Sequence, residues 1–258
     1  MSKIYILGSG AMAKAMAHGL KNSGFSVVLV SREKIDFSAS PELLGGVENE
    51  LYKNSFDIEG KDIILAFKPY ALGEVAKKLS GKAKKALSVL ASTDLEAVKS
   101  AVKSADYAIC MPNLAAAKNA SITPFLGDES LSDIISGFGK AVKMASKSEF
   151  DAAGIISGCA PAFLALVAEA LVNGAIRGGV RAKDANQLVS GLFDSVRVLL
   201  ASSHPALLKE SICSPAGTTI EGVAKLEEKG VRSAFIEAVA ASLNKQKGLG
   251  ILEFLNKI

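Results

Sequence analysis

The stretch IYILGSGAMA at residues 4–13 decides the fold of this chain. Its first four residues predict a short buried strand, and the pattern G-x-G-x-x-A leads from that strand directly into helical spacing. In this context Gly8 permits a tight turn, Gly10 lets a pyrophosphate approach the backbone, and Ala13 allows the helix to pack closely on the strand. The helix N-terminus favours the negative charge. The sequence therefore predicts a dinucleotide-binding turn made of Gly8, Ser9, Gly10, Ala11 and Met12.

Further short strand patterns follow this turn through the first half of the chain. They occupy residues 26–30, 62–67, 86–90 and 107–111, with helical patterns between them. Strands that alternate with helices indicate a parallel sheet with helices on both faces, and strands that are apolar throughout fit burial on both sides. We therefore expect residues 1–150 to form a Rossmann-type, doubly wound α/β domain that binds a dinucleotide.

The second half of the chain shows helical patterns only. They cover residues 161–177, 185–201, 219–228 and 231–247. We therefore expect residues 151–258 to form an all-helical domain. Because helices this apolar need a surface to pack against, a second subunit is expected to cover them. A single larger core within the chain is the alternative.

Composition excludes several classes of function. The 258 residues carry a formal net charge of +4, and no run of five like charges forms the basic stripe that is typical of a nucleic-acid interface. Three cysteines without C-x-x-C spacing argue against a disulfide framework and a zinc site. The two histidines, His18 and His204, leave little material for a metal site or a Ser-His-Asp triad. We expect neither a nucleic-acid partner nor a metal.

The sequence also offers no obvious membrane or export signal. The longest uninterrupted apolar run, at residues 159–168, is short against the roughly 18 residues that a membrane span needs. The first residues have the pattern of a buried strand, not of a signal peptide. We therefore expect a cytoplasmic protein without a membrane partner.

The residues after the second predicted strand bear on the choice of coenzyme. A site that prefers NAD usually carries a carboxylate here, which holds the ribose 2′-hydroxyl. This chain has Ser31 and Arg32 instead, and a hydroxyl with a guanidinium suits a 2′-phosphate. Glu33 follows and weakens the distinction. We predict NADP as cofactor, with NADPH preferred over NADH, and an ordinary exposed Ser-Arg turn is the alternative.

Four further motifs follow one another along the chain. AFKP at residues 66–69 is similar to A-V-K-P, and MPN at residues 111–113 follows a later strand. SGCAPAF at residues 157–163 resembles S-G-S-G-P-A-Y, and SPAGTTI at residues 214–220 resembles S-P-G-G-T-T-I. With the dinucleotide-binding turn, this ordered set covers nearly the whole chain and resembles the pyrroline-5-carboxylate reductases.

The resemblance implies an NAD(P)H-dependent reduction of the small molecule 1-pyrroline-5-carboxylate to L-proline, the last step of proline biosynthesis. It also implies a Rossmann domain followed by a helical dimerisation and substrate domain, assembled as a homodimer or a ring of dimers, with each active site using helices from two subunits. The implied coenzyme contacts are Asn54, Ala66, Phe67, Lys68, Pro69, Ala91 and Asn113. The implied substrate contacts are Ser214, Gly217, Thr218 and Thr219, with Thr219 as the catalytic residue.

The chemistry of the implied reaction agrees with these residues. The substrate is a cyclic imine that carries a carboxylate, and an imine that enters protonated needs orientation and charge compensation instead of a strong acid or base. Thr218 and Glu221 match the S/T-x-x-E capping box, which predicts a helix start whose N–H groups receive the carboxylate. Thr219 is then placed to hydrogen-bond the ring nitrogen. The alternative is that the threonines only cap the helix.

The chain departs from the family pattern at several small or loop positions. These are Cys159 and Ala160 in place of Ser and Gly, Ala216 in place of the first glycine of the pair, Leu114-Ala115 in place of T-P, Ala91-Ser92-Thr93 without the usual glycine, and Ser202 in place of an acidic residue before His-Pro. Each exchange keeps size or loop character, so we expect the fold to persist. Ala216 and Ser202 bear on substrate affinity.

Two other functions remain open at this point. A β-hydroxyacid dehydrogenase has the same two-domain plan, but it places a lysine on the helix after the domain junction, and this chain has no lysine between Lys147 and Lys183. The second alternative is a catalytically inert, NADP-binding relative with a regulatory role. Retention of Lys68, Asn113 and the Gly217-Thr218-Thr219 run argues against it.

Overall fold

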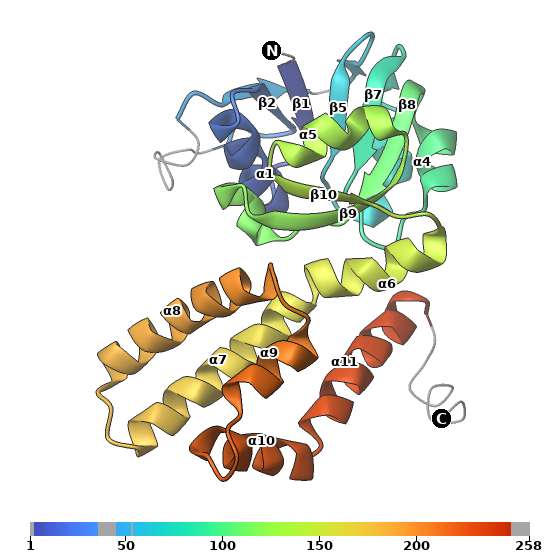
Figure 1. Cartoon of the computed structure of the whole chain (residues 1–258). Helices are drawn as coiled ribbons and strands as arrows, with labels where there is room; N and C mark the ends of the chain where they lie inside the picture. Colours follow the sequence, from blue (N-terminus) through green and yellow to red (C-terminus); the bar gives the residue numbers. More distant parts are fainter. Residues whose placement is uncertain (1–2, 36–44, 53, 249–258) are drawn as a thin grey trace. The chain divides into compact units, whose positions relative to one another are not determined.

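The computed structural model describes residues 3–35, 45–52 and 54–248. These residues pack as two units, one that ends at Gly158 and includes residues 246–248, and one that runs from Cys159 to Lys245. The first unit is α/β and the second is all-helical, which confirms the predicted fold class (Figure 1). The domain border expected at residue 150 falls inside helix α6 (Lys147–Gly158) and stays a prediction.

An eight-stranded sheet forms the centre of the first unit (Figure 1). Its order is β10-β9-β8-β7-β5-β1-β2-β3, and β8 with β9 is the only antiparallel pair among the described strands of this sheet. The strands are β1 (Lys3–Leu7), β2 (Ser26–Ser31), β3 (Glu48–Leu51), β5 (Asp62–Leu65), β7 (Ala83–Ser88), β8 (Ser104–Cys110), β9 (Ser121–Gly127) and β10 (Gly139–Lys143). A separate two-stranded sheet joins β4 (Phe56–Asp57) to β6 (Leu79–Ser80).

Helices and short 3-10 turns connect the strands of this unit. They are α1 (Ala11–Asn22), η1 (Pro69–Ala71), α3 (Leu72–Ala76), α4 (Leu95–Ala101), η2 (Leu114–Lys118), η3 (Glu129–Leu131), α5 (Ser132–Ser136) and α6. The strand–helix–strand unit β1-α1-β2 is the one that the glycine-rich stretch predicts.

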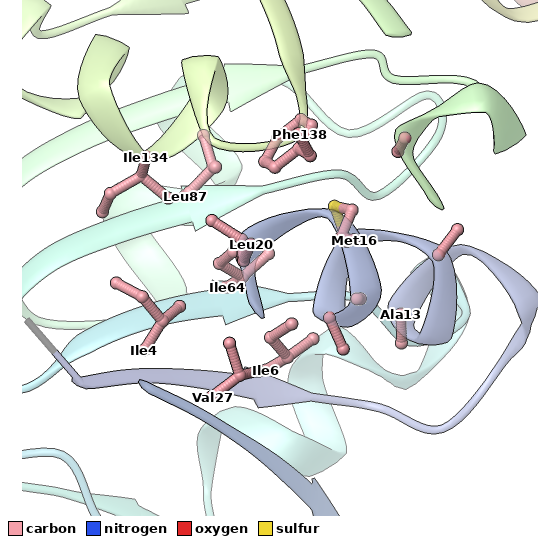
Figure 2. Close-up of a cluster of buried hydrophobic side chains, with 14 of the residues drawn as sticks. Ile4, Ile6, Ala13, Met16, Leu20, Val27, Ile64, Leu87, Ile134 and Phe138 are labelled. Atoms are coloured by element: carbon pink, nitrogen blue, oxygen red, sulfur yellow. The ribbon is translucent and has the colours of Figure 1, made fainter. Parts of the chain in front are cut away.

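Side-chain alternation along the strands builds an apolar layer on each face of the sheet. On β5, Ile64 belongs to one buried cluster, whereas Ile63 and Leu65 belong to the other. Figure 2 shows the first cluster, in which Met16 and Leu20 of α1 lie beside residues of β1, β5 and β7. This packing holds α1 against the sheet, so the first turn of α1 lies close to the end of β1, with only residues 8–10 between them.

Three strands of the sheet are absent from the sequence-based prediction. β3 (Glu48–Leu51, ENEL) is a polar strand at one edge, and its burial pattern has no buried residue. β9 contains Pro124, and β10 at the other edge has the sequence GKAVK. The edge strands β3 and β10 lack the continuous apolar run by which the buried strands are recognised, whereas β9, between β10 and β8, contains a proline, which argues against a strand when the sequence is read locally.

In the described part of the chain, five helices make up the second unit. They are α7 (Ala160–Arg177), α8 (Ala182–Leu200), α9 (Pro205–Ile212), α10 (Thr218–Glu228) and α11 (Val231–Gln246), the last of which ends at the border of the unit. Among its described residues only Ala185 and Val189 are buried hydrophobics. Large apolar side chains are exposed instead, among them Leu164, Leu166, Leu171, Leu188, Leu192, Val198, Leu207, Ile212, Leu226 and Ile236. The alternative of a larger core within the chain therefore does not account for these side chains.

One helical run bears on the expected absence of a membrane partner. Residues Lys147–Arg177, which comprise α6 and α7, are long and apolar enough to cross a membrane by length and composition alone. This segment does not contain an uninterrupted apolar run of that length, because a few polar residues lie between its apolar residues. Length and composition are weak evidence, so the expected absence of a membrane partner stays a prediction.

Candidate functional site

A cavity of about 440 Å³ opens where β1, β2 and β5 end. Its walls come from the turn after β1, the end of β2, the loop after β5 and the first residues of α3. Strand β1 lies between β2 on one side and β5 on the other, so the chain reverses its direction of winding at this point. Doubly wound sheets bind ligands in the crevice at such a switch point.

Gly8 and Gly10, in the turn after β1, lack a side chain for two different structural reasons. A Cβ on Gly8, whose φ is 139°, would lie 2.2 Å from the carbonyl oxygen of Ala66, so only glycine fits. Gly10 is the N-cap residue of α1, and a Cβ there would meet nothing within 4 Å. The space above Gly10 and the first N–H groups of α1 together fit a bound pyrophosphate.

The end of β2 presents Ser31 and Arg32 to the cavity. The buried Ser31 hydroxyl donates to the carbonyl oxygen of Glu33 at 2.6 Å and accepts from Asn49 at 2.9 Å. Its single proton is therefore already used, and the exposed Arg32 is the group that is free to contact an anion. No carboxylate occupies the end of β2 itself, as the sequence predicts.

The loop after β5 supplies Ala66, Phe67 and Lys68 to the cavity wall. Pro69 is not a wall residue and instead begins η1. Two tyrosines in the wall are absent from the prediction, namely Tyr52, which is nearly buried, and Tyr70, which is 89% exposed at the rim. The position of Tyr70 directly after the AFKP motif is the signal that would have identified it.

Glu74 is a further wall residue that the sequence does not single out. Lys78 donates to its carboxylate at 2.9 Å, and this hydrogen bond, with a smaller contribution from the positive charge of Arg32, holds the pKa of Glu74 below its usual value. The cavity wall therefore combines the carboxylate of Glu74 with the basic side chains of Arg32 and Lys68.

Besides Pro69, three predicted coenzyme contacts lie outside this cavity wall: Asn54, Ala91 and Asn113. The amide of Asn113 donates to the carbonyl oxygen of Ser157 at 3.1 Å and accepts from the N–H of Ala115 at 3.0 Å. The Ser157 hydroxyl in turn donates to the carbonyl oxygen of Met111 at 2.7 Å. These bonds join the MPN motif to the SGCAPAF motif, so both motifs have a structural role. The coenzyme roles of the three residues stay predictions.

In the second unit, the motif at residues 214–220 forms the start of α10. Gly217 is the N-cap residue and Thr218 the first helical residue, so the predicted capping box with Thr218 as cap is wrong by one position. A Cβ on Gly217 would lie 2.3 Å from the Ser214 hydroxyl, which explains the glycine by close approach. Because a glycine cap brings no side-chain acceptor, the first N–H groups of α10 are available to an anion.

Thr218 and Thr219 are exposed at this helix start. Within the described part of the chain, neither threonine hydroxyl is hydrogen-bonded to another protein group. The structure thus brings Ser214, Gly217, Thr218 and Thr219 together around one helix N-terminus. Their hydroxyls and N–H groups are donors that suit a small carboxylate.

Two loops retain a glycine conformation without the glycine. Ser92 and Ala216 have φ values of 55° and 56°, in the left-handed region. These residues lie in the two loops where the sequence lacks a glycine that is usual in the motifs. The backbone therefore keeps its path at both places, at a cost of roughly 1 kcal/mol per residue relative to glycine.

Comparison with known proteins connects both units to one kind of enzyme. Residues 147–249 match the family described as "Pyrroline-5-carboxylate reductase dimerisation", and residues 3–93 match "NADP oxidoreductase coenzyme F420-dependent". The chain is 36% identical over 261 residues to the pyrroline-5-carboxylate reductase of Helicobacter pylori strain J99, with 96% of this chain and 100% of that protein covered. It is 31% identical to the corresponding Escherichia coli K12 protein, with 96% and 98% covered.

Solved structures show the same two-unit architecture. The 1-pyrroline-5-carboxylate reductase of Streptococcus pyogenes is similar with a TM-score of 0.79 and 25% identity, covering 96% of this chain and 98% of that one. The Plasmodium falciparum pyrroline carboxylate reductase, solved with NADP bound, has a TM-score of 0.77 at 22% identity, with 95% and 98% covered. The latter likeness concerns the fold.

The different reasons for Gly8 and Gly10 lead to a first prediction. Gly8→Ala is expected to lower the free energy of unfolding by about 2 kcal/mol or more, because its methyl group meets the Ala66 backbone. Gly10→Ala should change it by less than about 1 kcal/mol, but weaken NADPH binding about 10-fold by occupying the pyrophosphate space. Thermal unfolding and fluorescence titration of both variants measure these effects. Equal effects of the two substitutions on stability would contradict the assignment.

The left-handed Ala216 leads to a second prediction. Ala216→Gly is expected to raise the free energy of unfolding by about 0.5–1 kcal/mol, because glycine adopts this φ without steric cost. Ala234→Gly, at an exposed position inside α11, is the matched control and should lower it by about 1 kcal/mol. Thermal unfolding at one fixed protein concentration provides the comparison. A loss of stability in Ala216→Gly would show that the loop conformation carries no strain.

Proposed function

Because this chain belongs to the pyrroline-5-carboxylate reductase family, we propose that it reduces 1-pyrroline-5-carboxylate to L-proline with a nicotinamide coenzyme. One observation carries the proposal. The chain keeps both an open dinucleotide cradle at the end of β1 and a glycine-capped, donor-rich start of α10, each within a motif of the family. A pyrroline-5-carboxylate reductase is 36% identical over 96% of this chain, so the similarity to the family includes both the α/β unit and the helical unit.

The start of α10 suits the substrate. The carboxylate of the cyclic imine is placed on the N–H groups of the first turn of α10, where the helix dipole also favours negative charge. The Ser214 and Thr218 hydroxyls add neutral donors beside it. Thr219 then hydrogen-bonds the ring nitrogen and orients the C=N bond. None of these groups needs to change its protonation state, because the imine enters as the protonated form.

The cavity of the first unit suits NADP. When bound, the nicotinamide supplies the hydride that the imine carbon receives. The turn from Gly8 to Met12 holds the pyrophosphate, and Arg32 pairs with the 2′-phosphate that distinguishes NADPH from NADH. Lys68 adds a second positive charge in the same wall. Ser31 acts through its hydrogen bonds within the turn, and Asn54, Pro69, Ala91 and Asn113 complete the proposed coenzyme contacts.

The rival reaction lacks its expected lysine on the helix after the domain junction. A β-hydroxyacid dehydrogenase requires a lysine that acts on the hydroxyl proton, and α7 has no lysine along its length. Its first turn contains Pro161 instead. Reduction of a protonated imine does not require a lysine at this position, so the side chains of α7 fit imine reduction better than alcohol oxidation.

The helical unit belongs to a homo-oligomer, since it matches a dimerisation family over residues 147–249. We propose a homodimer, alone or within a ring of dimers, in which a second copy covers the exposed apolar side chains of α7 to α11. A hollow of about 530 Å³ lined by Val223, Leu226, Val231, Phe235 and Ile236 belongs to the surface available for such contacts. Burial by protein then explains the apolar α6–α7 run without a membrane, and we propose the cytoplasm as the compartment.

Turnover of the purified protein tests the proposed reaction. Absorbance at the nicotinamide band is expected to fall when NADPH and 1-pyrroline-5-carboxylate are both present, with L-proline as the product. NADH is expected to support a slower reaction at equal concentration. Tight binding of NADPH without turnover would contradict the reductase assignment and indicate the inert, coenzyme-binding relative instead.

Thr219→Val tests the catalytic residue, because valine keeps the shape of the side chain and removes the hydroxyl. We expect a fall in kcat/KM of about 10–100-fold, the scale of removing one or two hydrogen bonds, while NADPH binding stays unchanged. Thr218→Val, at the adjacent position, removes a hydroxyl proposed to contact the carboxylate, and it should mainly raise KM with a smaller effect on kcat. An identical loss in both variants would assign the effect to the helix start as a whole and remove the specific role of Thr219.

A further inference from the structure

Asn49 on β3 makes an unusual set of hydrogen bonds at the end of β2. Its side-chain amide nitrogen donates to the carbonyl oxygen of Leu29 and to the hydroxyl of Ser31, both at 2.9 Å. Its amide oxygen accepts from the N–H of Ile35 at 3.0 Å. One partly buried side chain therefore connects β3 to both ends of the turn that follows β2.

These bonds also determine what the Ser31 hydroxyl does. Because the Ser31 oxygen accepts from Asn49, its own proton is directed elsewhere, and it is donated to the Glu33 carbonyl oxygen at 2.6 Å. The turn is thus closed by a chain of three hydrogen bonds that starts at the N–H of Ile35 and ends at Glu33. A satisfied chain of this kind holds a backbone more firmly than separate bonds do.

Among the described residues, no apolar packing holds the middle of this turn. Arg32, Glu33 and Lys34 are all exposed, and burial resumes only at Ile35. The direction in which Arg32 leaves the backbone therefore depends on the polar bonds made by Asn49. The same cavity wall also contains Glu74, whose carboxylate is paired with Lys78 at 2.9 Å.

We propose that Asn49 is a positioning residue for coenzyme selectivity: it fixes the turn at residues 31–35 so that Arg32 faces the 2′-phosphate of NADPH. This inference rests on the NADP coenzyme of the proposed function. Asn49 is not a residue of the cavity wall, so in this proposal it acts through Ser31 and Arg32. Its removal therefore affects NADPH, which carries the 2′-phosphate, and leaves NADH nearly unaffected.

Equilibrium binding separates this role from general support of the fold. The full-length variants Asn49→Ala, Arg32→Ala and the double variant are titrated with NADPH and with NADH by fluorescence. Asn49→Ala is expected to weaken NADPH binding about 10-fold, the scale of one charge-assisted hydrogen bond, and NADH binding less than about 2-fold. Glu48→Ala, on the same strand and paired with Lys3 at 2.9 Å, is the matched control and should change the affinity for neither coenzyme.

The double variant provides the decisive comparison. If Asn49 acts through Arg32, its removal causes no further weakening of NADPH binding once Arg32 is alanine, because residues that act in series are not additive. A separate, additive weakening, or an equal weakening for NADPH and NADH, overturns the proposal and leaves the reductase assignment intact. Failure of the unmodified protein to bind NADPH overturns the proposal, and failure to bind either coenzyme overturns the reductase assignment as well.

Ser31→Ala keeps the proposal testable if Asn49→Ala does not fold. It removes the hydroxyl that links Asn49 to Glu33 but leaves the bonds from Asn49 to Leu29 and Ile35 possible. The same selective loss of NADPH affinity is expected, though smaller. An unchanged ratio of the two dissociation constants in this variant would overturn the proposed chain of hydrogen bonds.

Discussion

The nucleotide-binding unit depends on how closely the ends of β1 and β5 approach each other. The Ala66 carbonyl oxygen occupies the space where any side chain at residue 8 would begin. This approach aligns the carboxyl ends of the two strands, so the turn after β1 and the loop after β5 face one cavity together with the end of β2. The missing methyl group of Gly8 is therefore a condition for the convergence of all three segments.

Two kinds of interaction hold the segments around that cavity in place: apolar packing and hydrogen bonds. Apolar packing of α1 against the sheet holds the pyrophosphate turn, since Ala13, Met16 and Leu20 are completely buried. The turn that carries Arg32 has no such packing and is held by hydrogen bonds from a neighbouring strand. The turn after β1, proposed to hold the pyrophosphate, is thus supported by the core, whereas the turn that carries Arg32, proposed to distinguish NADPH from NADH, is supported by hydrogen bonds from the polar edge strand β3.

The sequence predicts the nucleotide turn, the α/β-to-helical transition and, to within one residue, the start of α10, because each has a local pattern of glycines, proline or apolar spacing. It misses β3, and with it Asn49, because a polar edge strand resembles a loop when read locally. It displaces the cap of α10 by one residue, because Thr218 with Glu221 fits a capping box equally well on paper. Tyr70 could have been found from its position directly after the AFKP motif, whereas no local pattern places Glu74 of α3 in the cavity wall.

The helical unit buries Ala185 and Val189 but otherwise leaves its large apolar side chains in water. Such a unit gains most of its hydrophobic stabilisation only when another copy arrives, so completing its fold and finding a partner are a single concentration-dependent event. Until another copy covers them, the exposed apolar helices of a newly synthesised chain are open to aggregation. A copy with a damaged helical half also weakens the sound copies that it joins, so the subunits of the oligomer share the consequences of each other's mutations.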